Sequence, residues 1–470
     1  MAYQLTVDGN GHVREPESKT REYKQDLSSP EKAMRAVVAF ANSAGGQLVI
    51  GVADDGKVAG VADPLLEQER LTNLICNLVS PQLMPTIELV PLADATVVVA
   101  DIAVSIRLPH FLTKYGKEDG TYIRLGASNR QVGPDIIAEL ERTTAGIHFD
   151  KLPAFRATID DLDMVTLAQQ LGREVDKHTL KTLDLVTDDQ GHLTPTNGGI
   201  LVASPHPEQF FPFAWVQCAR FRGPTKRDIW DQESIYGPLP LAVDKVMRFL
   251  EQNAFLHAEF GDIYRKDVWS IPMAPLREFV TNALVHASYS RSGTPIKVAF
   301  LDQTIEIENP GGLMPDLTVE EMIQGVSRVR NHVVARVFKE LGLIEQWGTG
   351  IPQAIQRLAD AGLPAPEFKE FGASLRVIVH IEDHSVTPST VTSDGTVGGT
   401  VGGTAKSPAL LDSERSILKA LRTNGSLTAK TLVAETGVSE RQVKRILIKL
   451  RERGLLRREG SDRYGRWVVL

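Results

Sequence analysis

The 470-residue sequence has only two cysteines, Cys76 and Cys218, which lie far apart and have no ligand partner nearby. This scarcity argues against a disulfide framework and against a zinc site, and it favours a reducing compartment. No apolar run approaches the ~20 residues that a membrane-spanning helix needs. The start "MAYQLTVDGNGHV" lacks the charged and then apolar pattern of a signal peptide. We therefore expect a cytoplasmic protein without membrane contact.

Acidic residues outnumber basic ones over most of the chain. The net charge is −7, yet residues 413–470 hold 14 Lys and Arg against 6 Asp and Glu, a local balance of +8. Subtracting +8 from −7 leaves −15 for residues 1–412. Because nucleic acid is a polyanion, we expect it to meet the C-terminal end first.

Low-complexity sequence marks one boundary. Residues 385–409 read "SVTPSTVTSDGTVGGTVGGTAKSPA" and contain too little apolar surface to offset the entropy of ordering, so we interpret 383–412 as a flexible linker. Before it, helical and strand patterns alternate, which predicts a mixed α/β chain. Residues 146–185 have a largely helical pattern, and "LTPTNGGILVAS" predicts a turn leading into a buried strand.

The stretch "REFVTNALVHASYS" (residues 277–290) carries three polar residues at intervals of four: Glu278, Asn282 and His286. On a helix this spacing places them along one face, while the apolar residues between them bury the other side. A solvated polar edge is the simple interpretation. Two glycine-rich turns favour a binding site instead, one at Gly311 and Gly312 after a predicted strand and one at Gly348-Thr349-Gly350 before a predicted helix.

With these motifs, "IEIENPGGL", "SRVRNHVVARVFKELGLIEQWGTGI" and "GLPAPEF" make residues 190–380 resemble the RecG-like C-terminal module of bacterial regulators. That module is a divergent relative of the GHKL ATPase fold. The resemblance implies a site for ATP or another adenine nucleotide with magnesium. Asn282 would ligate the metal, Glu278 would serve as the general base in an ATPase, and the nucleotide would contact Asn309, Gly311, Gly312, Gly348, Thr349 and Gly350.

One departure from the ATPases weakens this expectation. ATPases of this fold carry an aspartate after the strand, and its carboxylate accepts a hydrogen bond from the adenine amino group. Here Glu308-Asn309-Pro310 stands in that turn, so only the weaker amide oxygen of Asn309 is available. We expect weak nucleotide binding, with slow hydrolysis or none.

The N-terminal segments "ES…EYK", "AFANSAGG", "IGVADDG" and "TYIRLGASNR" resemble the Schlafen AlbA-type domain over residues 15–142. One interpretation makes this unit a nucleic-acid-binding domain whose phosphate donors are Lys24, Arg124, Ser128, Asn129 and Arg130. Another brings Glu17, Glu22 and Asp54 or Asp55 together as a metal cluster that cuts nucleic acid. A scaffold without activity is the third alternative.

The C-terminal residues 413–470 have the pattern of a winged helix-turn-helix, with three helices and a hairpin. In the predicted third helix, Val443, Leu447 and Leu450 face inward. We expect contacts with double-stranded DNA from the exposed side of that helix and from the wing, through Arg441, Gln442, Lys444, Arg445, Lys449, Arg457, Arg458 and Arg463. A protein-binding winged helix is the alternative.

The sequence thus predicts an α/β multidomain protein with a mixed α/β AlbA-type domain, a GHKL-like α/β sandwich and a winged helix-turn-helix. The predicted divisions are 1–145, 146–189 (helical connector), 190–382, 383–412 (linker) and 413–470. The favoured function is a DNA-binding transcriptional regulator with a nucleotide-sensing core, forming a homo-oligomer, by analogy a dimer. The alternatives are a metal-dependent nuclease or an ATPase, with a role in phage defence, and whether the chain is an enzyme stays open.

Overall fold

The computed structural model describes residues 5–254, 256–260, 265–269, 271–290, 293–344, 348–371, 374–381, 412–423, 427–428, 431–433, 443, 446–447, 450, 456–459 and 466–469. The chain divides into two compact units, Met1–Val386 and Thr387–Leu470. The predicted linker 383–412 lies, except for its last residue, outside the described residues.

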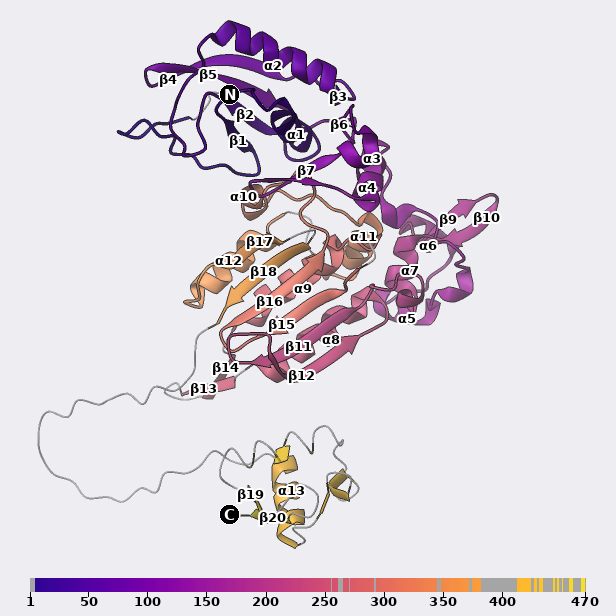
Figure 1. Ribbon diagram of the computed structural model, residues 1–470. Helices are drawn as coiled ribbons and strands as arrows, with labels where there is room; N and C mark the ends of the chain where they lie inside the picture. The colour runs from indigo at the N-terminus through magenta and orange to yellow at the C-terminus, as the bar shows by residue number, and fades with distance from the viewer. Residues whose placement is uncertain are drawn as a thin grey trace, which may run out of the picture. The chain divides into compact units, whose positions relative to one another are not determined.

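The N-terminal domain is a four-stranded sheet with helices packed against it (Figure 1). The strand order is β1 (Arg21–Lys24), β2 (Gly46–Ile50), β5 (Ala95–Ile102) and β4 (Thr86–Leu92). Only the β1–β2 pair is parallel. The helices are α1 (Pro30–Ala41), α2 (Pro64–Leu78), α3 (Gly116–Gly120) and α4 (Pro134–Thr144), and the short strands are β3 (Val79–Ser80), β6 (Phe111–Leu112), β7 (Tyr122–Leu125) and β8 (Ser128–Gln131).

The turn between α1 and β2 explains why the sequence carries glycine in its "SAGG" motif. Gly45 has φ +73°, and a Cβ there would lie 2.7 Å from the carbonyl oxygen of Ile102. Only glycine combines this left-handed conformation with so close an approach of two backbones. The turn lets the buried helix α1 lead directly into β2.

Between the two sheets the chain forms α5 (Met164–Leu171), α6 (Lys177–Thr182), a hairpin of β9 (Val186–Asp189) and β10 (His192–Pro195), and the 3₁₀ turns Phe149–Lys151, Ile159–Asp161 and Pro207–Gln209. The buried strand predicted within "LTPTNGGILVAS" is wrong, because these residues form the helix α7 (Asn197–Ala203). Thr196 caps it by accepting from the amide of Gly199 at 2.9 Å. A short apolar run has no periodicity that separates a strand from a buried helix.

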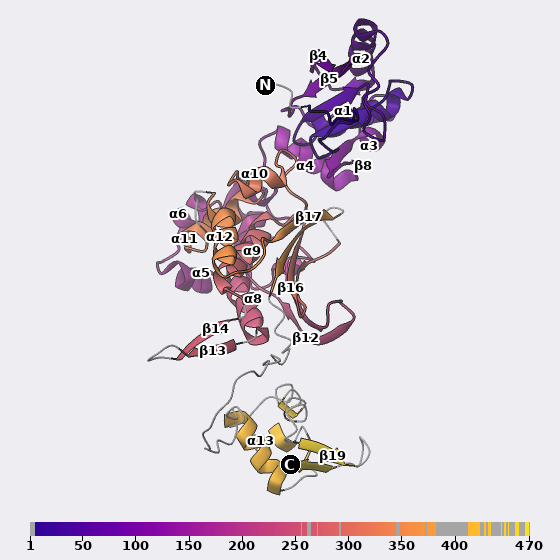
Figure 2. The same ribbon diagram turned by 90° about the vertical axis from the view of Figure 1, so that its left-hand side faces the viewer.

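The second sheet of the first unit has six strands in the order β12 (Asp228–Ile235), β11 (Val216–Arg222), β15 (Ile296–Phe300), β16 (Thr304–Pro310), β18 (Ser374–His380) and β17 (Glu367–Phe371). Neighbouring strands are antiparallel except β11 and β15. The helices α8 (Leu239–Asn253), α9 (Met273–His286) and α12 (Gly350–Asp360) lie on one face of this sheet, as Figure 2 shows. This arrangement is the α/β sandwich that the sequence predicts.

Among the described residues, the largest hydrophobic core fills the space between this sheet and its helices. It includes Phe279 and Leu284 of α9, Phe300 of β15 and Ile307 of β16. The remaining elements are α10 (Val319–Ile323), α11 (His332–Glu340), β13 (Leu256–Phe260) and β14 (Arg265–Trp269). Helix α9 ends at His286, so the last four residues of the predicted helix 277–290 lie beyond it.

The C-terminal unit contains α13 (Asp412–Thr423) and a hairpin of β19 (Leu456–Glu459) and β20 (Arg466–Val469). Val443, Leu447 and Leu450 are buried together with Ile417 and Leu421 of α13. The burial predicted for these three side chains is therefore confirmed.

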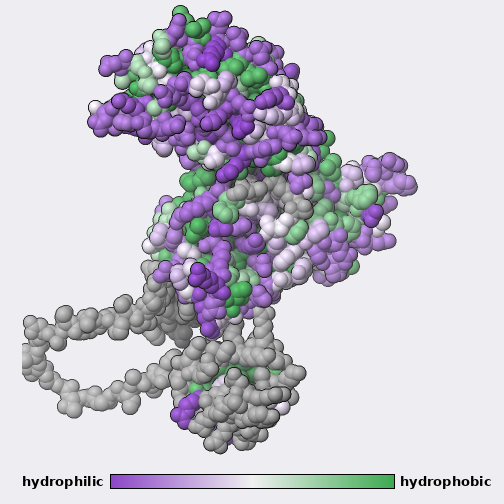
Figure 3. All heavy atoms as spheres, viewed as in Figure 1, coloured by the Kyte–Doolittle hydropathy of each residue, from purple (hydrophilic) through white to green (hydrophobic). Residues whose placement is uncertain are grey.

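None of the described helices has the length and apolarity needed to cross a membrane. On the face seen in Figure 3, the surface of the N-terminal domain is mostly hydrophilic.

Candidate functional site

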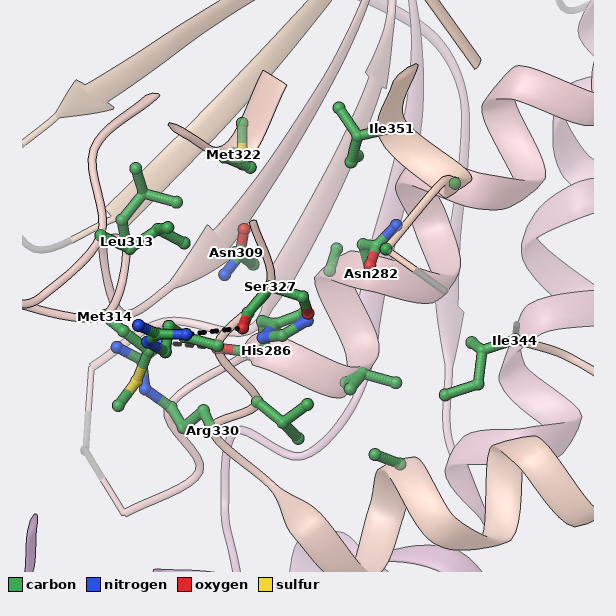
Figure 4. A pocket seen from close by; sticks show the side chains of 18 of the residues that line it. Asn282, His286, Asn309, Leu313, Met314, Met322, Ser327, Arg330, Ile344 and Ile351 are labelled. Carbon is green, nitrogen blue, oxygen red and sulfur yellow. Dashed lines mark hydrogen bonds between the residues drawn. The ribbon is translucent and has the colours of Figure 1, made fainter. Parts of the chain in front are cut away.

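One wall of a large cavity is built by the polar edge of α9. Glu278, Asn282 and His286 all line this cavity, as their spacing predicts. The amide nitrogen Nδ2 of Asn282 donates to the backbone oxygen of Glu278 at 2.9 Å and to Oε1 of its side chain at 2.7 Å. Because both bonds use the nitrogen, the amide oxygen of Asn282 is the atom left to face a ligand, and Figure 4 shows this side chain at the cavity.

A second wall is the turn after β16. Asn309 is buried and lines the cavity, and its Nδ2 donates to the carbonyl oxygen of Gly311 at 3.3 Å. Gly311 has φ +87°, and a Cβ there would lie 2.7 Å from Nη1 of Arg330. The glycine is therefore needed both for the turn and for the approach of the guanidinium group.

The third wall of the cavity is formed by two loops whose backbones approach each other closely. A Cβ at Gly348 would lie 2.3 Å from the carbonyl oxygen of Gly325, and both glycines have positive φ. Gly350 begins α12 against Glu278, since a Cβ there would lie 1.9 Å from Oε1 of that carboxylate. The predicted glycine loop therefore holds the acid of α9 in place, and Gly325, which we did not predict, is its backbone partner.

The cavity has a volume of about 840 Å³, which is in the range of sites for small molecules and cofactors. Of the predicted site residues, those that line it are Glu278, Asn282, Asn309, Gly312, Gly348 and Gly350, while Gly311 and Thr349 are their chain neighbours. The apolar part of the lining includes Leu313, Met314, Met322, Ile351 and Val377. Apolar walls with a few convergent polar groups suit a small molecule that has a flat aromatic ring and a polar chain.

Arg330 is a residue of this site that we did not identify from the sequence. Its Nη1 donates to the carbonyl oxygen of His286 at 2.6 Å, and its Nη2 to that of Gly312 at 3.1 Å. The guanidinium thus ties the end of α9 to the turn after β16, and Figure 4 shows Arg330 beside His286. Its Nε donates to Oε1 of Glu139 on α4 at 2.9 Å, so the N-terminal domain also contacts this residue.

His286 is neutral at physiological pH. Burial lowers the pKa of its imidazole to about 4, and the positive charge of Arg330 and the proximity of His332 act in the same direction. A lowered pKa disfavours protonation in the folded state. The imidazole is therefore suited to pack or accept at the cavity wall, and it does not offer a positive charge to phosphate.

We predict that the free energy of unfolding falls as the pH drops from about 6.5 towards 4. In this window the unfolded state binds a proton that folded His286 excludes, so the loss is about 1–2 kcal/mol for this partly exposed group. Denaturant unfolding at pH 7.5, 6 and 5 measures it. His286→Gln should flatten this dependence and His192→Gln, an exposed position on β10, should not. An equal slope in wild type and His286→Gln would contradict the assignment.

The predicted acidic cluster of the N-terminal domain is not formed. Among the residues that the structure describes, no three His, Cys, Asp or Glu side chains gather as metal ligands. Glu22 is buried and accepts from Nη1 of Arg124 and, at 2.5 Å, from Nζ of Lys24. Glu17 is exposed and accepts from the amide of Tyr23 at 3.0 Å, and Asp54 lies in an exposed turn.

The structure also corrects the expected role of Arg124. Its side chain is fully buried, and it donates to the carbonyl oxygens of Ser18 and Arg21 and to Oδ1 of Asn129 besides pairing with Glu22. It stabilises the domain interior and is not placed to meet phosphate. Among the other predicted donors, Ser128 and Arg130 are exposed on β8, while Lys24 is half-buried and paired with Glu22.

Six of the eight residues predicted to contact DNA lie outside the part of the chain that the structure describes. They are Arg441, Gln442, Lys444, Arg445, Lys449 and Arg463. Arg457 is exposed on β19, and Arg458 follows it in the same strand.

Comparison with known proteins agrees with the two resemblances. Residues 17–133 match the family described as "Schlafen, AlbA_2", and residues 293–379 match the family described as "Putative ATP-dependent DNA helicase recG C-terminal". The second match begins after α9, so it does not include Glu278, Asn282 and His286. No curated protein matches the chain.

Two solved structures are similar to parts or all of the chain. The DIP2311 protein from Corynebacterium diphtheriae has 18% identity and a TM-score of 0.43, over 98% of this chain and 94% of that one. The N-terminal domain of a RecG-related protein from Nitrosomonas europaea has 25% identity and a TM-score of 0.20, over 25% of this chain and 86% of that one. The family matches and the two sheets together define a mixed α/β protein with an AlbA-type N-terminal domain and an ATPase-like domain.

Proposed function

We propose that this chain is a DNA-binding transcriptional regulator whose ATPase-like domain binds an adenine nucleotide with magnesium. The observation that carries the proposal is the cavity of about 840 Å³ enclosed by α9, the turn after β16 and the loop before α12. These are the three places where the sequence carries its polar helix edge and its two glycine motifs. Family likeness of both domains to DNA-associated proteins supports the same function.

The residues present fit magnesium and a nucleotide. The amide oxygen of Asn282 is the hard ligand that magnesium prefers, and phosphate oxygens of the nucleotide would complete the coordination. Glu278, held by Asn282 and by Gly350, would orient Asn282 and a water molecule. The oxygen of Asn309 would accept from the base, since its nitrogen is bonded to Gly311.

Wild-type protein should bind ATP with magnesium weakly and hydrolyse it slowly or not at all. Replacing a carboxylate by the Asn309 amide exchanges a charged hydrogen bond for a neutral one, which costs about 1 kcal/mol, or several-fold in the dissociation constant. Calorimetry with ATP and magnesium measures binding, and a phosphate-release assay measures turnover. The absence of binding would contradict the proposal. Rapid turnover that is lost in Glu278→Ala would make the protein an ATPase.

The C-terminal unit would supply the specific contact to double-stranded DNA as a winged helix-turn-helix. We expect Arg445→Ala in the full chain to weaken binding to a specific duplex by about 1–3 kcal/mol if the guanidinium contacts a base edge. Arg422→Ala on the exposed side of α13 is the matched control and should cost less. Fluorescence anisotropy at several salt concentrations measures both. Duplex binding that is undetectable or independent of salt would favour a protein-binding winged helix.

By analogy with other winged-helix regulators, a dimer would bind a two-fold operator. The rival function, a metal-dependent nuclease, finds little support because Glu22 is already paired with Arg124. We expect purified protein to show little cleavage of RNA or DNA with magnesium or manganese.

A further inference from the structure

We propose that the N-terminal domain responds to the occupancy of the cavity through two buried ion pairs that meet at the Gly311–Gly312 turn. This inference rests on the proposed function, because it assumes that a nucleotide enters the cavity. It adds the coupling element that joins the nucleotide site to the AlbA-type domain.

The first ion pair runs through Arg330. The guanidinium binds the turn through Gly312 and pairs with Glu139 of α4 at 2.9 Å. The side chains of Arg330 and Glu139 are 8% and 13% exposed, so water screens their interaction little. Figure 1 shows α4 at the end of the N-terminal domain that lies next to the ATPase-like domain.

The second ion pair contacts the same turn through a different strand. Lys19 of the N-terminal domain pairs with Glu370 of β17 at 3.1 Å, and these side chains are 10% and 8% exposed. The carboxylate of Glu370 packs against Gly312, where an added Cβ would lie 3.2 Å from its Oε1. Two independent charged contacts from one domain therefore fix a turn that forms a wall of the cavity.

The contacts continue to the candidate phosphate donors of the N-terminal domain. Ser18, next to Lys19, accepts at its carbonyl oxygen from Nε of Arg124 at 3.0 Å. Nη1 of Arg124 donates to Oδ1 of Asn129 at 2.9 Å, in the β7–β8 hairpin that carries Ser128 and Arg130. A ligand that orders the Gly311–Gly312 turn reduces the freedom of this chain of contacts, so it should also order the hairpin.

Amide hydrogen exchange of the full chain, with and without saturating ATP and magnesium, tests the coupling. In wild type we expect nucleotide to slow exchange in the cavity segments 273–286 and 309–330, and at least about fivefold in the hairpin 122–131. The double variant Lys19→Gln/Glu139→Gln removes both ion pairs without changing a cavity residue. It should keep the slowing in the cavity segments and lose it in the hairpin.

The matched control is Lys117→Gln/Glu141→Gln, which removes an exposed ion pair within the same N-terminal domain. It should behave as wild type. If nucleotide slows exchange in the cavity segments of the wild type but not in its hairpin, the coupling is wrong and the proposed nucleotide binding still stands. Slowing in the hairpin that persists in Lys19→Gln/Glu139→Gln would overturn the role of the two ion pairs. No slowing anywhere would mean that nucleotide does not bind, and the proposed function would fail with the inference.

Discussion

Replacing Asn282 by alanine should weaken binding of ATP with magnesium by about tenfold to a hundredfold. The change removes the amide oxygen that would ligate the metal, and it also removes both hydrogen bonds from Nδ2 to Glu278. The carboxylate then loses the partner that holds it at the cavity wall. Calorimetry with ATP at fixed magnesium measures the loss, and repeating it without magnesium shows whether the metal carries the difference.

Asn253→Ala is the matched control for this prediction. Asn253 lies at the end of α8 and, like Asn282, donates its Nδ2 to the backbone carbonyl four residues earlier, at 2.9 Å from the oxygen of Phe249. Asn253→Ala shows how much ATP binding changes when an equivalent side-chain hydrogen bond is lost away from the cavity. If Asn282→Ala and Asn253→Ala bind ATP equally well, the polar edge of α9 is a structural feature and the magnesium assignment is wrong.

The site was predictable where its residues are close in sequence. Glu278, Asn282 and His286 occur at helical spacing, and spacing alone places them on one face of α9. The glycine positions could also be predicted, because few other residues tolerate positive φ or the close approach of a second backbone. The same locality explains why the inward positions Val443, Leu447 and Leu450 were correctly assigned.

Residues that act through distant partners could not be found in this way. Arg124 is a charged residue that alternates with the apolar Ile123 and Leu125 in a strand pattern, so it resembles a surface donor, yet its partner Glu22 lies 102 residues earlier. Arg330 is one of two arginines in "SRVRN", and its contacts with Glu139, His286 and Gly312 distinguish it from the other. No periodicity or motif in a single sequence encodes such contacts.

The same distinction bears on how the protein works. Sequence patterns predict a nucleotide site and a basic C-terminal region, but they reveal no element that would join that site to the N-terminal domain. The structure supplies such a candidate within its first unit, where Lys19 and Glu139 contact residues beside the cavity. Buried ion pairs are weak contributors to net stability but strong determinants of geometry, because breaking one leaves a charge without its partner.

Replacing Glu22 by alanine should destabilise the N-terminal domain by about 3–5 kcal/mol. The change leaves the fully buried guanidinium of Arg124 without its carboxylate, and the remaining partners of that guanidinium are neutral oxygens. Amide hydrogen exchange in β1, β2 and β5 measures the free energy of opening of this domain, separately from the rest of the chain.

Glu17→Ala distinguishes this structural role of Glu22 from a catalytic one. Glu17 is exposed and accepts a single backbone hydrogen bond, from Tyr23, so its loss should cost only about 1 kcal/mol. A nuclease would instead need both acids, and each variant would abolish a metal-dependent cleavage that the wild type performs. If the wild type cleaves nucleic acid and Glu22→Ala keeps normal stability, Glu22 has a catalytic and not a structural role. An acid that can be removed without loss of stability does not hold Arg124 in the domain interior.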